Sequence, residues 1–218
     1  MKQKILLLGA YGQNNLGDEL LLATFLNIFK RYDLIANSTS PLETKNQFGI
    51  ETFTKNADLL KYLFKVKYVV VGGGSQFKTL PSVFKRNPNS LLLNIFLVTL
   101  ATRLLFKKIY FISVGAGPLD TKISKLLTKL IIVFSNKVLV RDTQSFDLLH
   151  QISPNKKLIS SADGLYFAKA VIEKQLKANL SQKKQSKEII ISPNLNTKDE
   201  KLRQIEIDLL AELTNKLI

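Results

Sequence analysis

Two acidic residues stand directly after a glycine- and asparagine-rich loop near the start of the sequence. The loop, residues 9–17, follows the apolar run 5–8, and Asp18 and Glu19 open the helical pattern that comes next. Ligands of open parallel sheets bind outside the carboxyl ends of the strands, so a carboxylate here could take the proton of a substrate hydroxyl. A carboxylate at a helix start can equally well complement the helix dipole, and both interpretations stay open.

Three further charged residues follow later apolar runs in the same way. Arg141 and Asp142 come directly after residues 138–140, and Asp163 follows residues 158–160. The Arg-Asp pair is either an ordinary ion pair at a strand end or an arm that grips an anion. Asp163 is either a turn or capping residue or a part of the same site.

Two more loops are rich in glycine. Glycine lets the backbone approach a ligand and exposes N–H donors, so three such loops along one edge favour a crevice for a phosphate or carboxylate. The alternative is that each glycine only shapes a tight turn. The loops are Gly72-Gly73-Gly74-Ser75-Gln76 and Gly115-Ala116-Gly117-Pro118.

The familiar nucleotide-binding motifs fail on their spacing. Gly12-x4-Gly17 has the glycine separation of a P-loop, but acidic residues replace the lysine and the Ser/Thr that must follow. Gly115-x-Gly117 begins like a dinucleotide fingerprint, yet Asp120 occupies the position of the third glycine. A Walker A site is excluded, and a dinucleotide site is weakly supported.

The composition excludes several other kinds of site. The 218 residues contain no cysteine and one histidine, so a disulfide framework, a thiol nucleophile and a histidine-rich metal site are not expected. His150 ends a predicted helix away from the polar loops. We therefore expect no metal and no cofactor.

Short apolar runs alternate with longer helical patterns, which is typical of βα units and a parallel sheet. The most apolar segment, residues 91–106, contains polar residues and is too short to span a bilayer, so no transmembrane helix is expected. We expect strands at residues 5–8, 34–36, 68–71, 109–114, 138–140 and 158–160. We expect helices at residues 18–30, 57–64 with Asn56 as N-cap, 90–106, 121–134 and 143–151.

The pattern changes after residue 166. Residues 1–167 should form a Rossmann-like α/β domain, a parallel sheet with flanking helices, and residues 168–187 a connecting helix and lysine-rich linker. Residues 188–218 hold one strand and one helix, too little for a core of their own. We interpret them as the start of an incomplete C-terminal domain.

The ordered set of loops resembles the polysaccharide pyruvyl transferase family over roughly residues 4–167. The resemblance rests on Gly12-Gln13-Asn14-Asn15-Leu16-Gly17-Asp18-Glu19, the triple glycine with Ser75, Gly115-Ala116-Gly117-Pro118, Val140-Arg141-Asp142 and Ala162-Asp163. It implies the N-terminal half of a fold similar to the two-domain GT-B glycosyltransferases. It also implies transfer of a pyruvate ketal from phosphoenolpyruvate to a sugar of a cell-surface polysaccharide or its lipid-linked precursor.

That reaction needs an acid for the donor's methylene carbon, a base for the sugar hydroxyl, and cations for phosphate and carboxylate. In the family, the Arg and His residues expected to hold the donor lie largely in the second domain. This chain carries only the start of that domain, and Ser192-Pro193-Asn194 stands where similar proteins tend to carry an arginine. Whether the chain is an active enzyme by itself therefore stays open.

The resemblance transfers a set of site residues to this sequence. Asp18 and Asp142 are the candidates for the base or for orienting a hydroxyl. The substrate-binding candidates are Gly12, Asn14, Asn15, Gly17, Glu19, Gly72, Gly73, Gly74, Ser75, Gln76, Gly115, Gly117, Arg141 and Asp163. The alternatives are a non-catalytic or truncated acceptor-binding domain and a GT-B nucleotide-sugar glycosyltransferase.

The net charge of +15 is concentrated in one segment. Residues 61–140 hold 13 basic groups and a single acid, Asp120, and so supply +12 of it. Lys122, Lys125 and Lys129 share one face of a predicted helix whose other residues are largely apolar. This pattern suits a cytoplasmic protein on an anionic membrane surface, and it suits a solvated lysine face over a buried leucine face equally well. No nucleic acid partner is expected, because no recognition-helix motif accompanies the charge.

Overall fold

The computed structural model describes residues 2–13, 15–54, 56–80 and 87–168. All of these residues belong to the first of two compact units, Met1–Lys177. The one strand and one helix that the sequence predicts within residues 188–218 lie outside the described residues, as does nearly all of the predicted connecting helix and linker. The division into residues 1–167, 168–187 and 188–218 therefore stays a prediction.

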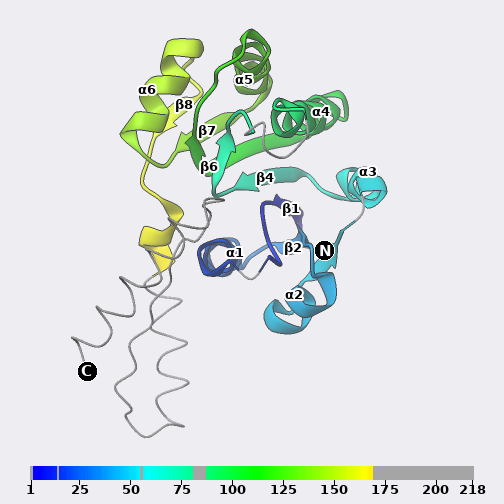
Figure 1. Ribbon diagram of the computed structural model, residues 1–218. Helices are drawn as coiled ribbons and strands as arrows, with labels where there is room; N and C mark the ends of the chain where they lie inside the picture. The colour runs from blue at the N-terminus through cyan, green and yellow to red at the C-terminus, as the bar shows by residue number, and fades with distance from the viewer. Residues whose placement is uncertain (1, 14, 55, 81–86, 169–218) are drawn as a thin grey trace, which may run out of the picture. The chain divides into compact units, whose positions relative to one another are not determined.

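The strands of the described part form one parallel sheet in the order β3-β2-β1-β4-β6-β7-β8, with β5 paired to β6 (Figure 1). The chain builds the sheet outward from β1 in one direction and from β4 in the other, so the order reverses between these two strands. A reversal of this kind leaves a crevice at the carboxyl ends of the strands. The bounds are β1 Lys4–Leu8, β2 Asp33–Asn37, β3 Glu51–Phe53, β4 Tyr68–Gly72, β5 Ser75–Phe77, β6 Lys108–Ala116, β7 Lys137–Val140 and β8 Leu158–Ser160.

Helices cover both faces of the sheet. The helices α1 and α2 lie on one face and α3 to α6 on the other, so the central strands are apolar on both sides (Figure 1). Leu6 packs into the larger core under α3 to α6, while its neighbours Ile5 and Leu7 pack under α1. The bounds are α1 Leu16–Ile28, α2 Pro41–Phe48, α3 Asn56–Lys65, α4 Ser90–Leu104, α5 Lys122–Phe134 and α6 Thr143–Ile152, followed by the 3-10 helix η2 Gly164–Ala168.

The fold class expected from the sequence is confirmed, and each strand and helix predicted between residues 5 and 160 is present. Helix α1 begins two residues earlier than expected, because Asn15 accepts the Gly17 N–H and acts as its N-cap. Asp18 and Glu19 therefore lie within the first turn rather than at its start. Thr121 caps α5 instead of belonging to it, and its side chain and that of Ser124 form a capping box.

Besides the 3-10 helix η2, three elements were not predicted, and each of these three carries a weak sequence signal. The strands β3 and β5 are three residues long, and each includes polar residues. Helix α2 has a largely polar sequence without apolar periodicity, and Thr44 is the residue that it buries. Proximity to a neighbouring strand, rather than local sequence, fixes β5, which pairs with β6 through Ser75 and Phe77. Within the described ranges, no helix has both the length and the apolar character needed to cross a bilayer.

Helix α1 lies against the backbone of β4 and the loop after it. A Cβ on Gly72 would stand 2.2 Å from the Phe25 ring, and one on Gly73 would stand 1.9 Å from Leu21 Cδ2. Phe25 and Leu21 are themselves buried. These two glycines are therefore needed for close packing between α1 and the sheet.

We predict that Gly72→Ala destabilises the domain by about 1–3 kcal/mol, because the new methyl group overpacks a buried aromatic contact. Gly17→Ala is the matched control, since its Cβ would meet only Asn15 Oδ1 at 3.4 Å. Alanine also has the higher helix propensity, so the control should change stability little or raise it. Urea unfolding of both variants tests this, and equal midpoints for the two would contradict it.

Candidate functional site

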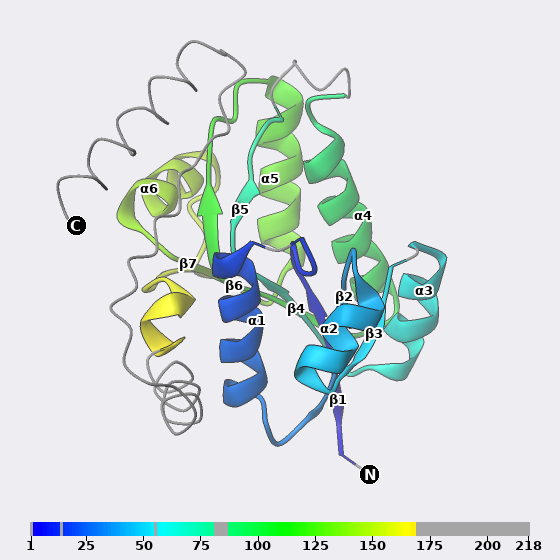
Figure 2. The same ribbon diagram turned by 60° about the horizontal axis from the view of Figure 1, so that its bottom comes forward.

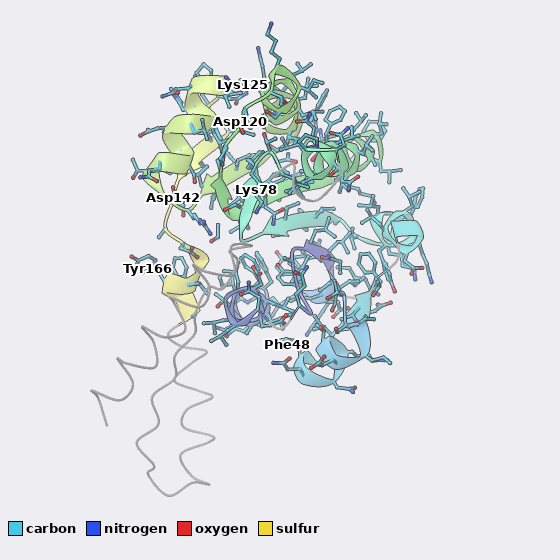
Figure 3. The ribbon with its side chains drawn as sticks, in the orientation of Figure 1. Phe48, Lys78, Asp120, Lys125, Asp142 and Tyr166 are labelled. Carbon is cyan, nitrogen blue, oxygen red and sulfur yellow. The ribbon has the colours of Figure 1, made fainter. Side chains whose placement is uncertain are left out.

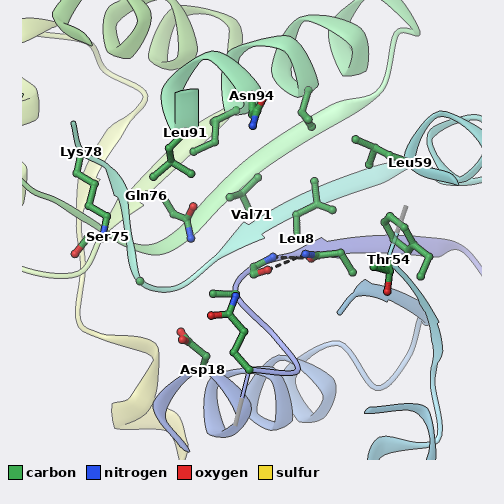
Figure 4. A pocket seen from close by; sticks show the side chains of 18 residues that line it. Leu8, Asp18, Thr54, Leu59, Val71, Ser75, Gln76, Lys78, Leu91 and Asn94 are labelled. Atoms are coloured by element: carbon green, nitrogen blue, oxygen red, sulfur yellow. Dashed lines mark hydrogen bonds between the residues drawn. The ribbon is translucent and has the colours of Figure 1, made fainter. Parts of the chain in front are cut away.

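The first loop and the triple-glycine loop border a pocket of about 490 Å³ between α1 and α4 at the carboxyl edge of the sheet (Figure 4). The predicted site residues Gly115, Gly117, Arg141, Asp142 and Asp163 do not line this pocket. The pocket lies at the reversal between β1 and β4. One part of its wall is polar and contains Gln13, Asp18, Asn37, Ser75, Gln76, Lys78 and Asn94. The other part is apolar and contains Leu8, Phe53, Leu59, Val71, Leu91, Ile95 and Val98.

Asp18 is the carboxylate that lines this pocket. It is half-buried in the first turn of α1 and lies close to Gly74, whose Cβ would stand 3.9 Å from Asp18 Oδ1. Burial raises the pKa of Asp18, and the Arg141 guanidinium lowers it only in part. A carboxylate with a raised pKa at the mouth of a pocket is suited to proton transfer.

Arg141 brings several of the predicted site residues together. Its Nε lies 3.2 Å from Asp142 Oδ2, its Nη1 lies 3.9 Å from Asp163 Oδ2, and its Nη2 donates to Ser75 Oγ at 3.5 Å. A Cβ on Gly115 would stand 2.8 Å from its Nε, so the guanidinium lies along bare backbone. The two carboxylates leave Arg141 little free charge with which to hold a ligand anion.

Asp142 is the N-cap of α6, in the short connection between β7 and that helix (Figure 3). Its Oδ1 accepts the Ser145 N–H at 2.7 Å, and its Oδ2 accepts the Ser145 hydroxyl at 3.0 Å. Burial acts to raise the pKa of Asp142, but the bonds from Ser145 and Arg141 outweigh it and hold the pKa below its ordinary value. A carboxylate stabilised in this way is a poor base, so the geometry favours Asp18 over Asp142.

Asp163 is held by an unusual residue of β6. Ser113 has φ of 59°, where the register of β6 against β7 shifts between Phe111 and Val114. Its hydroxyl donates to Asp163 Oδ1 at 3.2 Å and accepts the Gly164 N–H at 2.6 Å. The left-handed conformation of Ser113 thus positions Asp163 beside Arg141.

The first loop is fixed by Glu19, which the sequence identified only as a candidate ligand contact. Glu19 Oε1 accepts the Gly12 N–H at 2.6 Å, while Glu19 Oε2 is buried without a hydrogen-bond partner among the described atoms. Gly12 has φ of 75° and packs against Ser38. Asn15 and Gly17 form the cap of α1, and Asn14 lies outside the described residues.

Five of the loop glycines use their N–H groups within the fold. Gly73 donates to Ile112 O at 3.1 Å, Gly115 to Gly74 O at 2.9 Å, and Gly117 to Phe77 O at 2.8 Å. Together with Gly12 and Gly17, they are not free donors for a phosphate. These five glycines therefore do not support the interpretation of the loops as a backbone anion cradle. Among the three consecutive glycines, Gly74 lies beside Asp18 and Gln76, whereas Gly72 and Gly73 make room for α1.

Other residues of the site had no local sequence signal. Asn37 clamps the first loop, accepting the Gly9 N–H and donating to the Gly9 carbonyl, both at 2.8 Å. Asn94 reaches the pocket from α4, and Lys78 from the segment after β5 (Figure 4). Lys78 forms no ion pair with the described residues. Only the three-dimensional arrangement of separate elements reveals these contributions.

Tyr11 is a further buried group at the site. Burial, with the nearby Asp18 and Glu19 carboxylates, raises the pKa of Tyr11 far above its ordinary value, so its phenol stays protonated. His150 stacks on Phe146 within α6 and is not a pocket residue. No group of three or more His, Cys, Asp or Glu side chains in the described ranges could hold a metal ion.

The parallel sheet with its reversal between β1 and β4 defines a Rossmann-like α/β domain. The chain belongs to the polysaccharide pyruvyl transferase family, whose model matches residues 15–216. No curated protein matches the sequence significantly.

Two solved structures share the fold at low sequence identity. Anabaena HepE, crystallised with UDP and glucose, superposes with a TM-score of 0.50 at 12% identity, over 74% of this chain and 44% of its own. The UDP-GlcNAc 2-epimerase of Neisseria meningitidis, bound to UDP-GlcNAc, gives a TM-score of 0.53 at 14% identity, over 82% and 51%. The chain thus spans about half the length of these proteins, and the likeness concerns the fold alone.

The carboxyl groups of Asp18 and Asp142 should titrate on opposite sides of the ordinary aspartate pKa. We predict that Asp18 titrates above it and Asp142 below it, and that Arg141→Gln raises the pKa of Asp18 further, because the guanidinium that favours its charged form is gone. Carbon-13 NMR titration of labelled aspartate measures both, with Asp18→Asn to identify the resonance. Arg31→Gln, an exposed arginine at the end of α1, is the control and should leave Asp18 unchanged. An Asp18 that titrates at or below the ordinary value would refute this electrostatic account.

Proposed function

We propose that this domain takes part in the transfer of a pyruvate ketal from phosphoenolpyruvate to a sugar, with the sugar acceptor in the pocket beside Asp18. The observation that carries the proposal is the half-buried Asp18 carboxylate, with its raised pKa, in the wall of that pocket. The wall also offers amide side chains beside apolar ones, and a sugar ring has both hydroxyls and apolar faces. Family membership supports the class of reaction.

The chemistry sets the requirements for the site. One sugar hydroxyl adds to the carbon that bears the phosphate, while the methylene group of the donor gains a proton and becomes a methyl group. A second hydroxyl then attacks the same carbon, and the carbon–oxygen bond to phosphate breaks. Each hydroxyl loses its proton; one of the two protons is taken up by the methyl group, and the other goes to the departing phosphate, which leaves as inorganic phosphate. A base near the hydroxyls is therefore needed.

Asp18 is our choice for that base. Its partial burial raises its pKa and makes it a stronger base than an exposed aspartate, while the Arg141 guanidinium favours its ionised form. Arg141 acts through Asp18, Asp142 and Asp163 rather than on the ligand, because its charge is already balanced by carboxylates. We assign Arg141, Asp142 and Asp163 positioning roles.

The donor carries a phosphate and a carboxylate, and both need cations. Among the described pocket residues, Lys78 offers a positive charge without an ion-pair partner. Ser75 and Gln76 lie beside it and supply hydrogen-bonding groups. We propose that Lys78 meets the anionic donor and that Gln76 and Asn94 contact the acceptor.

The acceptor is proposed to be a saccharide of a cell-surface polysaccharide, either free or linked to a lipid. A lipid-linked acceptor would place the protein in the cytoplasm, on the inner face of the cell membrane. The alternative is a nucleotide-sugar glycosyltransferase. The observation that favours it is the fold likeness to two proteins crystallised with UDP or a UDP-sugar.

We predict that the protein releases phosphate from phosphoenolpyruvate in the presence of its sugar acceptor, and that Asp18→Asn lowers kcat by about 10²–10⁴-fold, the usual range for loss of a general base. Asp33→Asn is the matched control, since Asp33 is exposed at the opposite edge of the sheet. It should keep full activity. Phosphate release over a panel of saccharides provides the measurement.

Thermal unfolding with ligands separates the alternatives, because a ligand that binds the folded state at a hundredfold excess over its Kd adds about 2.7 kcal/mol of stability. Stabilisation by a saccharide without phosphate release identifies an acceptor-binding domain. Stabilisation by a UDP-sugar but not by phosphoenolpyruvate identifies a glycosyltransferase. Phosphate release that Asp18→Asn leaves unchanged would remove Asp18 from the reaction.

A further inference from the structure

The outer surface of α4 and α5 combines exposed apolar and basic side chains. The two helices lie side by side on one face of the sheet (Figures 1 and 2). We call this surface the α4–α5 face. It comprises Leu93, Leu97, Arg103, Leu104, Lys122, Ile123, Lys125, Leu126, Lys129 and Val133, all of which are exposed.

Helix α4 is apolar on its outer side as well as on its inner side. Leu93, Leu97 and Leu104 follow one another at spacings of four and seven residues and so form one stripe, in which Leu97 is 52% and Leu104 is 69% exposed. A helix that is hydrophobic all round is normally covered by protein or by lipid. Its outer stripe is thus a surface without a partner among the described residues.

The exposure of the α5 side chains bears on the two interpretations that its sequence allowed. A solvated lysine face over a buried leucine face would hide Ile123 and Leu126. They are instead 58% and 57% exposed, beside Lys122 and Lys125. Leu127 and Ile131 form the buried side of the helix. Apolar and basic side chains therefore share the outward side of α5, as in helices that bind at a bilayer interface.

The charge of the α4–α5 face has one sign. Arg103, Lys122, Lys125 and Lys129 are its charged residues, and neither helix contains an acidic residue. Lys125 lies over α5 on the side turned away from the sheet (Figure 3). Such a face would repel a second copy of itself, which argues against a symmetric dimer through this surface.

A groove continues the face toward α6. It has a volume of about 400 Å³ and is lined by Lys125, Leu126, Lys129, Leu148, Gln151 and Ile152. A groove with apolar residues and two cations can bind an anionic lipid at the point where its acyl chains meet its headgroup. A nucleic acid would use the lysines but would leave the leucines exposed.

We infer that the α4–α5 face binds the surface of an anionic bilayer, with Leu97, Ile123 and Leu126 entering the interface and the lysines meeting lipid headgroups. This inference deepens the proposed function, because α4 lines the acceptor pocket with Leu91, Ile95 and Val98 on its other side. A bilayer against α4 would bring lipid-linked saccharides next to the pocket. The binding itself requires neither donor nor acceptor and is tested without them.

The first test is flotation of the full chain with vesicles of phosphatidylcholine alone or mixed equally with phosphatidylglycerol. We expect binding to the anionic vesicles only, weakening as salt is added. The triple variant Lys122→Gln, Lys125→Gln, Lys129→Gln should bind about a hundredfold more weakly, since each lysine near an anionic surface contributes roughly fivefold. The control replaces Lys2, Lys30 and Lys45 with glutamine; all three are exposed, and they lie before β1, after α1 and on α2. It removes the same charge and should change binding by less than about fivefold.

The second test uses the absence of tryptophan from the sequence. Leu126→Trp places one fluorophore on the α4–α5 face, and its emission should shift to the blue when anionic vesicles are added. Leu42→Trp, at an exposed position of α2, should not shift. A blue shift of Leu126→Trp with protein concentration alone would indicate self-association and overturn the inference. So would equal binding to both vesicle types, or binding that the triple variant retains.

Discussion

The close approach of α1 to β4 is the packing constraint on which the site depends. Gly72 and Gly73 remove the side chains that would hold the helix away, and Phe25 and Leu21 fill the space. Because the helix lies so close, its first turn places Asp18 beside Gly74 at the edge of the pocket. Asn15 caps the helix and Glu19 ties it to Gly12, so its N-terminal end is fixed as well.

The electrostatics of the rim follow from one guanidinium among several carboxylates. Arg141 lies within 4 Å of Asp142 and Asp163 and acts on Asp18 from a greater distance. Asp142 gains two bonds from Ser145 and is stabilised in its charged form, whereas Asp18 is half-buried and loses solvation. Their surroundings thus shift the pKa values of these two aspartates in opposite directions. This difference distinguishes the structural carboxylate, Asp142, from the proposed reactive one, Asp18.

The sequence was informative about structural features that one short segment determines by itself. Continuous apolar runs such as Tyr68-Val69-Val70-Val71 identified the central strands, and the residues after those strands identified the edge of the site. It was uninformative where the partner lies far along the chain. The β5 strand depends on β6, and the uses of the Gly73, Gly115 and Gly117 N–H groups depend on carbonyls that a sequence pattern does not reveal. The same holds for Asn94, which reaches the pocket from α4, and for Lys78, which reaches it from the segment after β5.

Helix α4 joins the two surfaces with which this domain is proposed to act. Its inner side supplies Leu91, Ile95 and Val98 to the pocket, and its outer side presents Leu93, Leu97 and Leu104. Both surfaces are apolar, so the helix has almost no amphipathic pattern, and from sequence alone it looks like an ordinary core helix. Neighbouring elements give its two sides different roles. Strand β4 and α1 complete a polar pocket on one side, while the lysines of α5 make the other side suitable for an anionic surface. The positive charge concentrated in residues 61–140 is therefore unevenly placed, because on α4 and α5 the basic residues lie on the side that faces away from the sheet.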